Sequence, residues 1–203
     1  MGEEINATVY VVDDDEAILD SLQLLLKTAG FQACTYDGPE KFLSDYEPTR
    51  PGCLILDIQM PGMTGLELQE ILADVGSILP IIFITGHADI PIAVQAMKDG
   101  AFEFLQKPFN DTVLLDYVTK ALSLNERQQK EITATQSVIA RIEKLSPREK
   151  QVFERVAQGK SGKVIASELN LSPRTIEIYR SHVMLKMQAN SAVELANLMN
   201  LTR

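Results

Sequence analysis

Four polar side chains suited to phosphoryl chemistry follow short apolar runs in the first half of the chain. Asp13 follows one run, Asp57 and Thr85 each end another, and Lys107 comes directly after a fourth. Carboxylates bind hard cations such as Mg²⁺, and an Asp carboxylate can act as a nucleophile toward a phosphoryl group. A cation and an ammonium group neutralise phosphoryl oxygens, which is the main requirement of phosphoryl transfer. These residue types together predict a phosphoryl-transfer site, provided that the fold brings them to one place.

The segments between these residues predict a fold that would do so. Apolar runs alternate with amphipathic stretches of helical period, and the runs are residues 8–13, 32–36, 53–57, 80–85 and 102–106. This alternation predicts an α/β doubly wound, five-stranded parallel sheet. Ligands of such sheets bind beyond the carboxyl ends of the strands, so we expect the polar residues there to converge. Taken alone, the run Asp13, Asp14 and Asp15 is also typical of a solvated turn or a helix cap.

The second half of the chain differs in charge and pattern. Residues 1–125 hold 20 acidic and 6 basic residues, a net of −14, and residues 126–203 hold 8 acidic and 13 basic, a net of +5; the total is −9. The split favours two domains with different partners, the basic one suited to phosphates. Ser146 and Ser172, each followed by Pro, are typical helix N-caps. Short helices with a tight turn before a basic helix predict a small all-α helix-turn-helix domain, residues 144–203.

A stretch without Gly or Pro, residues 110–146, joins the two halves and predicts helix. Residues 112–122 are apolar enough to complete a first domain of residues 1–122, and the polar residues that follow predict a helical linker, 123–143. A heptad seam can be drawn through Val118, Ala121, Asn125, Gln128, Ile132, Thr135, Ile139 and Ile142. Half of these positions are polar or small, so a coiled-coil dimer and a solvated linker helix both stay open.

The motifs VVDDD, LILDIQMPGMTGLEL, FITGHAD and EFLQKPF resemble the receiver domain of two-component response regulators over residues 5–122. The resemblance implies strand order 2-1-3-4-5 and identifies Asp57 as the acceptor of a phosphoryl group from a sensor histidine kinase. It implies Mg²⁺, for which Mn²⁺ can substitute, as the cofactor. The implied metal ligands are Asp13, Asp14, Asp57 and the backbone carbonyl of Gln59.

The same resemblance implies roles for residues near the acceptor. Thr85 and Lys107 would contact the phosphoryl group, Phe104 would be the switch aromatic, and the Lys107–Pro108 bond would be cis. Gln59 and His87 occupy positions that tune the phosphoryl lifetime in such domains. Helix capping suffices to explain Asp15.

Residues 145–203 resemble the helix-turn-helix of quorum-sensing and nitrate-response regulators, through LSPRE, LSPRTIE and KM. Nearly the whole chain resembles the nitrogen-fixation oxygen-response subfamily. Residues 173–187 would be the recognition helix, lying in the major groove. The exposed early turns would present Arg174, Glu177, Ile178 and Ser181 to the bases, whereas Thr175, Arg180, Lys160 and Lys186 would meet phosphates. Ile176, Val183 and Met187 are expected in the core, and His182 is interpreted as structural. Gly162 stands where the family has Asn.

These features predict a cytoplasmic, non-membrane regulator of transcription, with activation favoured by family habit. It would not be an enzyme beyond Mg²⁺-dependent self-phosphorylation and slow autodephosphorylation. The expected partners are the kinase, a second copy of the phosphorylated chain, double-stranded DNA with a dyad-symmetric site, and RNA polymerase. The alternatives are an aspartate-nucleophile phosphatase, a phosphorelay or adaptor protein whose helical tail binds protein, and a DNA binder independent of phosphorylation. Cys34 and Cys53 are interpreted as buried, inert thiols.

Overall fold

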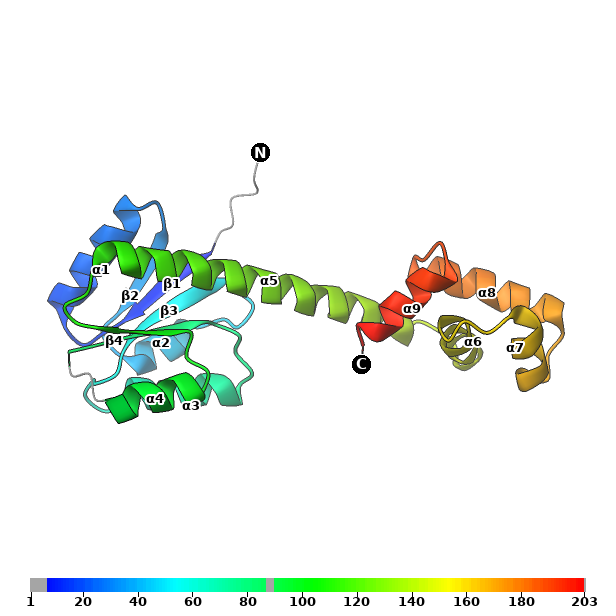
Figure 1. Ribbon diagram of the computed structural model, residues 1–203, viewed down its shortest axis with the longest axis horizontal. Coiled ribbons are helices and arrows are strands. Elements are labelled where there is room, and N and C mark those ends of the chain that lie inside the picture. The colour runs from blue at the N-terminus through cyan, green and yellow to red at the C-terminus, as the bar shows by residue number, and fades with distance from the viewer. Residues whose placement is uncertain (1–6, 87–89, 203) are drawn as a thin grey trace. The chain divides into compact units, whose positions relative to one another are not determined.

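The computed structural model describes residues 7–86 and 90–202. The chain forms two compact units, Met1–Gln129 and Lys130–Arg203. The first combines strands with helices and the second is helical, and the long helix α5 (Asp111–Glu143) contributes to both (Figure 1). In the part of the chain that is described, no helix is both long and apolar enough to cross a membrane.

A five-stranded parallel sheet forms the centre of the first unit. Its strands are β1 (Thr8–Val12), β2 (Gln32–Tyr36), β3 (Gly52–Asp57), β4 (Ile81–Thr85) and β5 (Glu103–Gln106). The order β2-β1-β3-β4-β5 confirms the predicted doubly wound sheet. Strands β1, β3 and β4 are buried throughout, which explains why they appear in the sequence as continuous apolar runs.

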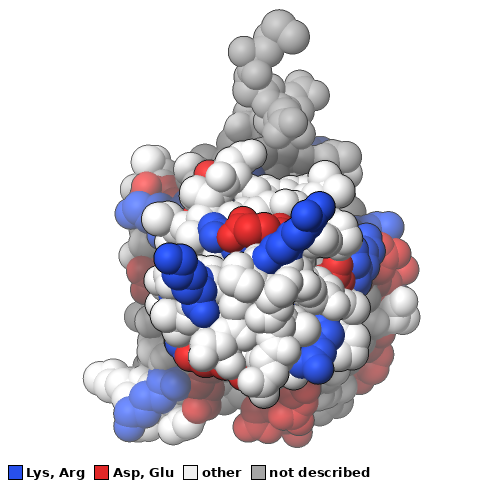
Figure 2. Space-filling view, turned by 90° about the vertical axis from the view of Figure 1, so that its right-hand side faces the viewer, with Lys and Arg blue, Asp and Glu red and all other residues white. Residues whose placement is uncertain are grey.

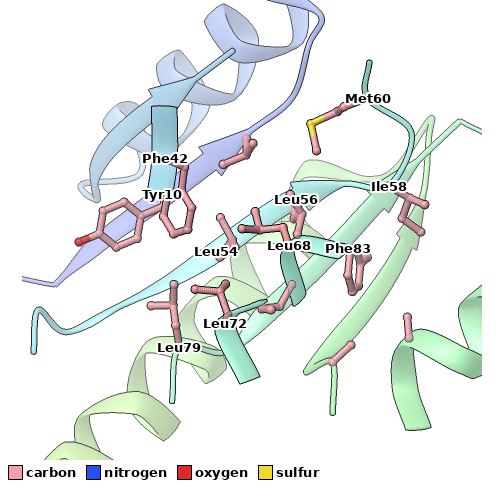
Figure 3. Close-up of a cluster of buried hydrophobic side chains, with 14 residues drawn as sticks. Tyr10, Phe42, Leu54, Leu56, Ile58, Met60, Leu68, Leu72, Leu79 and Phe83 are labelled. Carbon is pink, nitrogen blue, oxygen red and sulfur yellow. The ribbon is translucent and has the colours of Figure 1, made fainter. Parts of the chain in front are cut away.

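Helices cover both faces of this sheet (Figure 1). One face packs on α1 (Glu16–Thr28) and α5, and the other on α2 (Pro39–Asp45), α3 (Gly65–Asp74) and α4 (Ile90–Lys98). Successive side chains of each strand alternate between the two layers. Figure 3 shows the layer beneath α2 and α3, where Phe42, Leu68 and Leu72 meet the side chains of the strands. Since both faces are filled with apolar groups, polar chemistry is confined to the ends of the strands.

The two cysteines lie in different environments. Cys53 in β3 is fully buried, as predicted, and burial raises the pKa of its thiol. Cys34 is only partly buried, because β2 is an edge strand. The expectation of a buried thiol is therefore wrong for Cys34.

Several residues of the possible heptad seam on helix α5 pack within the chain itself and are not available for a coiled coil. Val118, Ala121 and Asn125 are buried in the first unit, and Ile142 packs against the core of the second. Ile132 and Ile139 are exposed. The apolar positions of the seam left on the surface therefore lie between residues 132 and 139.

Four shorter helices complete the second unit. They are α6 (Pro147–Ala157), α7 (Gly162–Leu169), α8 (Pro173–Met187) and α9 (Ala192–Asn200). Ser146 and Ser172 cap α6 and α8 as predicted, and each side chain accepts a hydrogen bond from a backbone N–H of the first turn. The predicted core residues Ile176, Val183 and Met187 are fully buried. They join α8 to the apolar faces of the neighbouring helices.

Candidate functional site

Two carboxylates and one ammonium group meet beyond the carboxyl ends of the strands. Asp57 is the last residue of β3, and Asp13 follows β1; the two residues are 5% and 1% exposed. Lys107 Nζ donates to Asp57 Oδ1 at 2.8 Å and to Asp13 Oδ2 at 2.6 Å. The structure thus brings together three residues, of which Asp13 and Lys107 lie 94 positions apart in the sequence.

Charge compensation holds this cluster together. Burial raises the pKa of the Asp13 carboxyl above its ordinary value, although the hydrogen bond from Lys107 acts in the opposite direction. Burial also opposes the charge of Lys107, but its hydrogen bonds to Asp13 and Asp57 outweigh that effect, and its pKa is raised. Lys107 is therefore an ammonium ion at neutral pH and can neutralise an anion bound at Asp57.

Thr85 and Gln59 lie on neighbouring segments, and each is hydrogen-bonded to a residue of the cluster through its backbone. Thr85 ends β4 and is 1% exposed, and its backbone carbonyl accepts a hydrogen bond from the Lys107 N–H at 2.8 Å. The backbone N–H of the exposed residue Gln59 donates to Asp57 Oδ2 at 2.7 Å. The Lys107–Pro108 bond is cis, as the resemblance implied.

The other residues predicted around the site occupy varied environments. Phe104 lies in β5 opposite Phe83 and is half-buried against the core. Asp14 is exposed, and Asp15 caps α1 by accepting from the Ala17 N–H at 2.9 Å. His87 lies outside the described residues.

Gly65 belongs to the site and was missed by the sequence reasoning. It is the first residue of α3, and a Cβ built on it would lie 2.2 Å from the Asp57 carbonyl oxygen. Only glycine therefore allows α3 to begin this close to Asp57. Thr64 caps α3 in a reciprocal capping box with Glu67, and the signal in the sequence was this Thr-Gly pair at a helix start.

The donor set fits a hard divalent cation that keeps several waters. Among residues 7–86 and 90–202, no group of three or more His, Cys, Asp or Glu side chains is arranged to hold a metal ion. Asp13 and Asp57 nevertheless lie close together, since one carboxylate oxygen of each binds the same Lys107 nitrogen. Mg²⁺ is commonly held by one or two carboxylates together with water and phosphate oxygens.

Helix α8 presents a second, basic surface. Arg174, Ile178 and Ser181 share its exposed side, and Glu177 stands beside them with its carboxylate 3.5 Å from Arg180 Nη1. Leu185 continues this side one turn further and is 79% exposed, a feature that the sequence reasoning did not single out. The Thr175 hydroxyl is within 2.8 Å of Ser172 Oγ at the start of the helix.

Two lysines predicted to contact phosphates already hold carboxylates. Lys186 Nζ donates to Glu149 Oε2 at 2.7 Å and to the Lys144 carbonyl at 3.3 Å. Lys160 Nζ donates to Glu168 Oε1 at 2.6 Å. An ammonium group has three donors, so Lys160 has two left and Lys186 has one. Figure 2 shows Lys and Arg side chains distributed across a face that is otherwise mostly uncharged.

A doubly wound sheet with buried carboxylates and a lysine beyond the carboxyl ends of its strands, joined to a small helical unit, is the organisation of a DNA-binding response regulator. The comparisons agree: the response regulator receiver domain matches residues 9–119, and the luxR family of bacterial regulatory proteins matches residues 143–199. The chain belongs to the response regulators that carry a luxR-type DNA-binding domain.

Full-length relatives share this organisation. The transcriptional regulatory protein FixJ of Bradyrhizobium diazoefficiens is 46% identical over 190 residues, covering 94% of this chain and 93% of FixJ. The response regulator protein TmoT of Ectopseudomonas mendocina is 41% identical, covering 93% of this chain and 86% of TmoT. The structure of the response regulator StyR matches with a TM-score of 0.89 and 40% identity, covering 96% and 98% of the two chains. The chain is thus a transcription regulator with a receiver domain.

Proposed function

We propose that a sensor histidine kinase phosphorylates Asp57 and that the phosphorylated chain binds a dyad-symmetric DNA site as a homodimer. The observation that carries this proposal is the convergence of Asp13, Asp57 and Lys107. An ion pair that serves only the fold needs one carboxylate and one ammonium group, whereas Lys107 is bound by the carboxylates of both Asp13 and Asp57. Two carboxylates that share one ammonium suit a site that accepts both a cation and a dianion.

The chemistry is a transfer between two side chains. An Asp57 carboxylate oxygen attacks the phosphorus of the kinase phosphohistidine, the P–O bond forms as the P–N bond breaks, and the imidazole leaves with the electron pair. Mg²⁺, held by Asp13, Asp14, Asp57 and the Gln59 carbonyl, would neutralise phosphoryl oxygens. Lys107 stays within hydrogen-bond reach and compensates the added charge on the acyl phosphate.

The switch follows from contacts that exist only after phosphorylation. The Thr85 hydroxyl turns toward the phosphoryl oxygen, and the half-buried ring of Phe104 moves inward into the space this leaves. A phosphoryl group shifts the equilibrium between two states only by its different affinity for each. Gln59 and His87 would set the lifetime of the acyl phosphate, and its slow hydrolysis would be the only turnover.

Receiver pairing would use the surface of α4 and β5. Ile90, Val94 and Met97 expose apolar side chains on this helix, and they are 77%, 46% and 42% exposed. Burial of such groups favours association.

We place the domain boundaries at residues 1–122, 123–143 and 144–203, so that the linker is the second part of α5.

The basic unit would place α8 in the major groove. Arg174 can donate two hydrogen bonds to guanine, Glu177 can accept from cytosine, and Ile178 can contact a thymine methyl. Ser181 would face a base edge on the same side, and the phosphate contacts are expected from Lys160, Thr175, Arg180 and Lys186. RNA polymerase would be the partner at the promoter, in the cytoplasm.

A selection of genomic DNA fragments by the purified chain tests this proposal. Wild type is compared with and without acetyl phosphate and Mg²⁺, and Asp57→Asn serves as the matched variant. A dyad motif that needs both the donor and Asp57 is the expected result. The same motif in all samples would overturn phosphorylation control, and no enrichment in any sample would favour the adaptor alternative.

A further inference from the structure

Asn125 is a buried amide outside the residues that match the receiver domain. It lies on α5, six residues beyond position 119, and is 1% exposed. Its Oδ1 accepts a hydrogen bond from the Gly52 N–H at 3.0 Å, and its Nδ2 donates to the Ile78 carbonyl at 2.9 Å. Both polar groups of this side chain therefore have backbone partners.

These partners stand at the starts of two particular strands. Gly52 is the first residue of β3, which ends at Asp57, and Ile78 lies three residues before β4, which ends at Thr85. The same two strands are hydrogen-bonded neighbours, with Leu54 paired to Ile81. Asn125 thus joins α5 to the starts of β3 and β4, and the opposite ends of these two strands carry Asp57 and Thr85.

The contact tolerates little change. A Cβ on Gly52 would lie 2.3 Å from the Thr8 carbonyl oxygen, so the backbone at the start of β3 is held close to β1. A buried amide that loses one of its partners without gaining water is costly. If β4 shifts along β3, Asn125 either moves with both strands or loses a hydrogen bond.

Helix α5 continues without a break from this contact to Glu143. Four residues after Asn125, Gln129 Nε2 donates to the Pro48 carbonyl at 3.3 Å, which extends the attachment to the segment before β3. Further along, Val138 is buried in the core of the second unit. One helix is therefore anchored both to β3 and β4 and to the DNA-binding unit.

We infer that Asn125 is a positioning residue that makes α5 follow the relative placement of β3 and β4, and so transmits phosphorylation of Asp57 to the DNA-binding unit. The inference rests on the proposed function, because it concerns how phosphorylation increases DNA affinity. Asn125 touches neither the phosphoryl group nor DNA. Replacing Asn125 should therefore leave phosphorylation of Asp57 unchanged but reduce the increase in DNA affinity that phosphorylation causes.

The test replaces Asn125 by the similarly shaped Leu and uses Val118→Ala as the matched control. Val118 is fully buried on the same helix, so its truncation also destabilises the unit but leaves the amide contacts in place. Phosphorylation is followed by mass spectrometry with acetyl phosphate and Mg²⁺. DNA affinity is measured by fluorescence anisotropy with a duplex carrying the dyad motif recovered by phosphorylated wild type.

We expect all three proteins to be phosphorylated at rates within about twofold, because Asn125 lies at the far end of β3. The fold-increase in DNA affinity on phosphorylation should fall at least fivefold in Asn125→Leu and stay at the wild-type value in Val118→Ala. A wild-type increase in Asn125→Leu would overturn the inference and leave the proposed function intact. Absence of any increase in wild type itself would overturn both.

Hydrogen exchange of the wild type covers the case in which Asn125→Leu does not fold. Peptides that contain Gly52 and Asn125 should change their exchange rates on phosphorylation, together with the second part of α5. Unchanged exchange at both positions, while the peptides around Asp57 respond, would overturn the inference.

Discussion

Glu149 at the start of α6 and Lys186 near the end of α8 form an ion pair of 2.7 Å between Oε2 and Nζ. Glu149 is 4% exposed and also accepts the Ser146 N–H in a capping box at 2.7 Å. His182 Nδ1 lies 3.7 Å from its other oxygen. One buried carboxylate thus ties α8 to α6 within the DNA-binding unit.

Glu149→Gln should destabilise the DNA-binding unit by about 1–3 kcal/mol, because Lys186 and the Ser146 N–H lose a charged acceptor. Urea unfolding of the full chain, followed at the transition of this unit, measures the effect. Glu154→Gln in the exposed part of the same helix is the control and should change little. Equal stability of the two variants would contradict a structural role for the pair.

This ion pair also predicts how stability depends on pH. The hydrogen bond from Lys186 lowers the pKa of Glu149 below its ordinary value of 4.5. A carboxyl whose pKa is lower in the folded than in the unfolded state stabilises the fold above the unfolded pKa, and this contribution is lost as the pH falls through the folded pKa. The stability difference between wild type and Glu149→Gln should therefore shrink as the pH falls below 4.5. A difference that grows as the pH falls below 4.5 would contradict this assignment.

Gly65→Ala should disturb the site around Asp57 directly. Its Cβ would lie 2.2 Å from the Asp57 carbonyl oxygen, so either α3 or the end of β3 must move. We expect a loss of about 1–3 kcal/mol in unfolding free energy and slower phosphorylation by acetyl phosphate. Gly38→Ala, whose Cβ would meet its nearest neighbour at an ordinary 3.6 Å, is the matched control. Wild-type phosphorylation rates in Gly65→Ala would show that the close approach is dispensable.

Gly162→Ala should alter base preference rather than stability. A Cβ there would lie 3.0 Å from Glu177 Oε1, the end of a flexible side chain that can move aside at little cost. The displaced carboxylate would weaken discrimination at the base pair that we propose faces Glu177, to the degree expected of Glu177→Gln. Selection from a randomised duplex library reads this out, with Ser167→Ala on the same helix as the control. If Gly162→Ala changes the overall DNA affinity but leaves the base preference unchanged at every position of the duplex, the prediction is wrong.

Much of this architecture could be predicted from local patterns. The apolar runs around Val11, Ile55 and Ile84 mark buried strands because parallel strands covered on both faces need apolar side chains throughout. Strand order then follows from the resemblance, and the edge at which Asp13, Asp57 and Lys107 meet follows from strand direction. Ser146 and Ser172 each indicate a helix start, because the capping hydrogen bond joins residues only three positions apart and the pattern is therefore visible in the sequence.

The tertiary structure alone decided which polar groups pair across the fold. Asn125 meets Gly52 across 73 positions, and Lys186 meets Glu149 across 37. No local pattern encodes these contacts, because a polar residue on a helix is equally compatible with solvent, a coiled-coil seam or a buried partner. Burial makes the choice, since an amide or carboxylate removed from water must find a partner. The residue types and their order determine a receiver joined to a helix-turn-helix, whereas packing decides that Asn125 faces the sheet and that Lys186 holds a carboxylate.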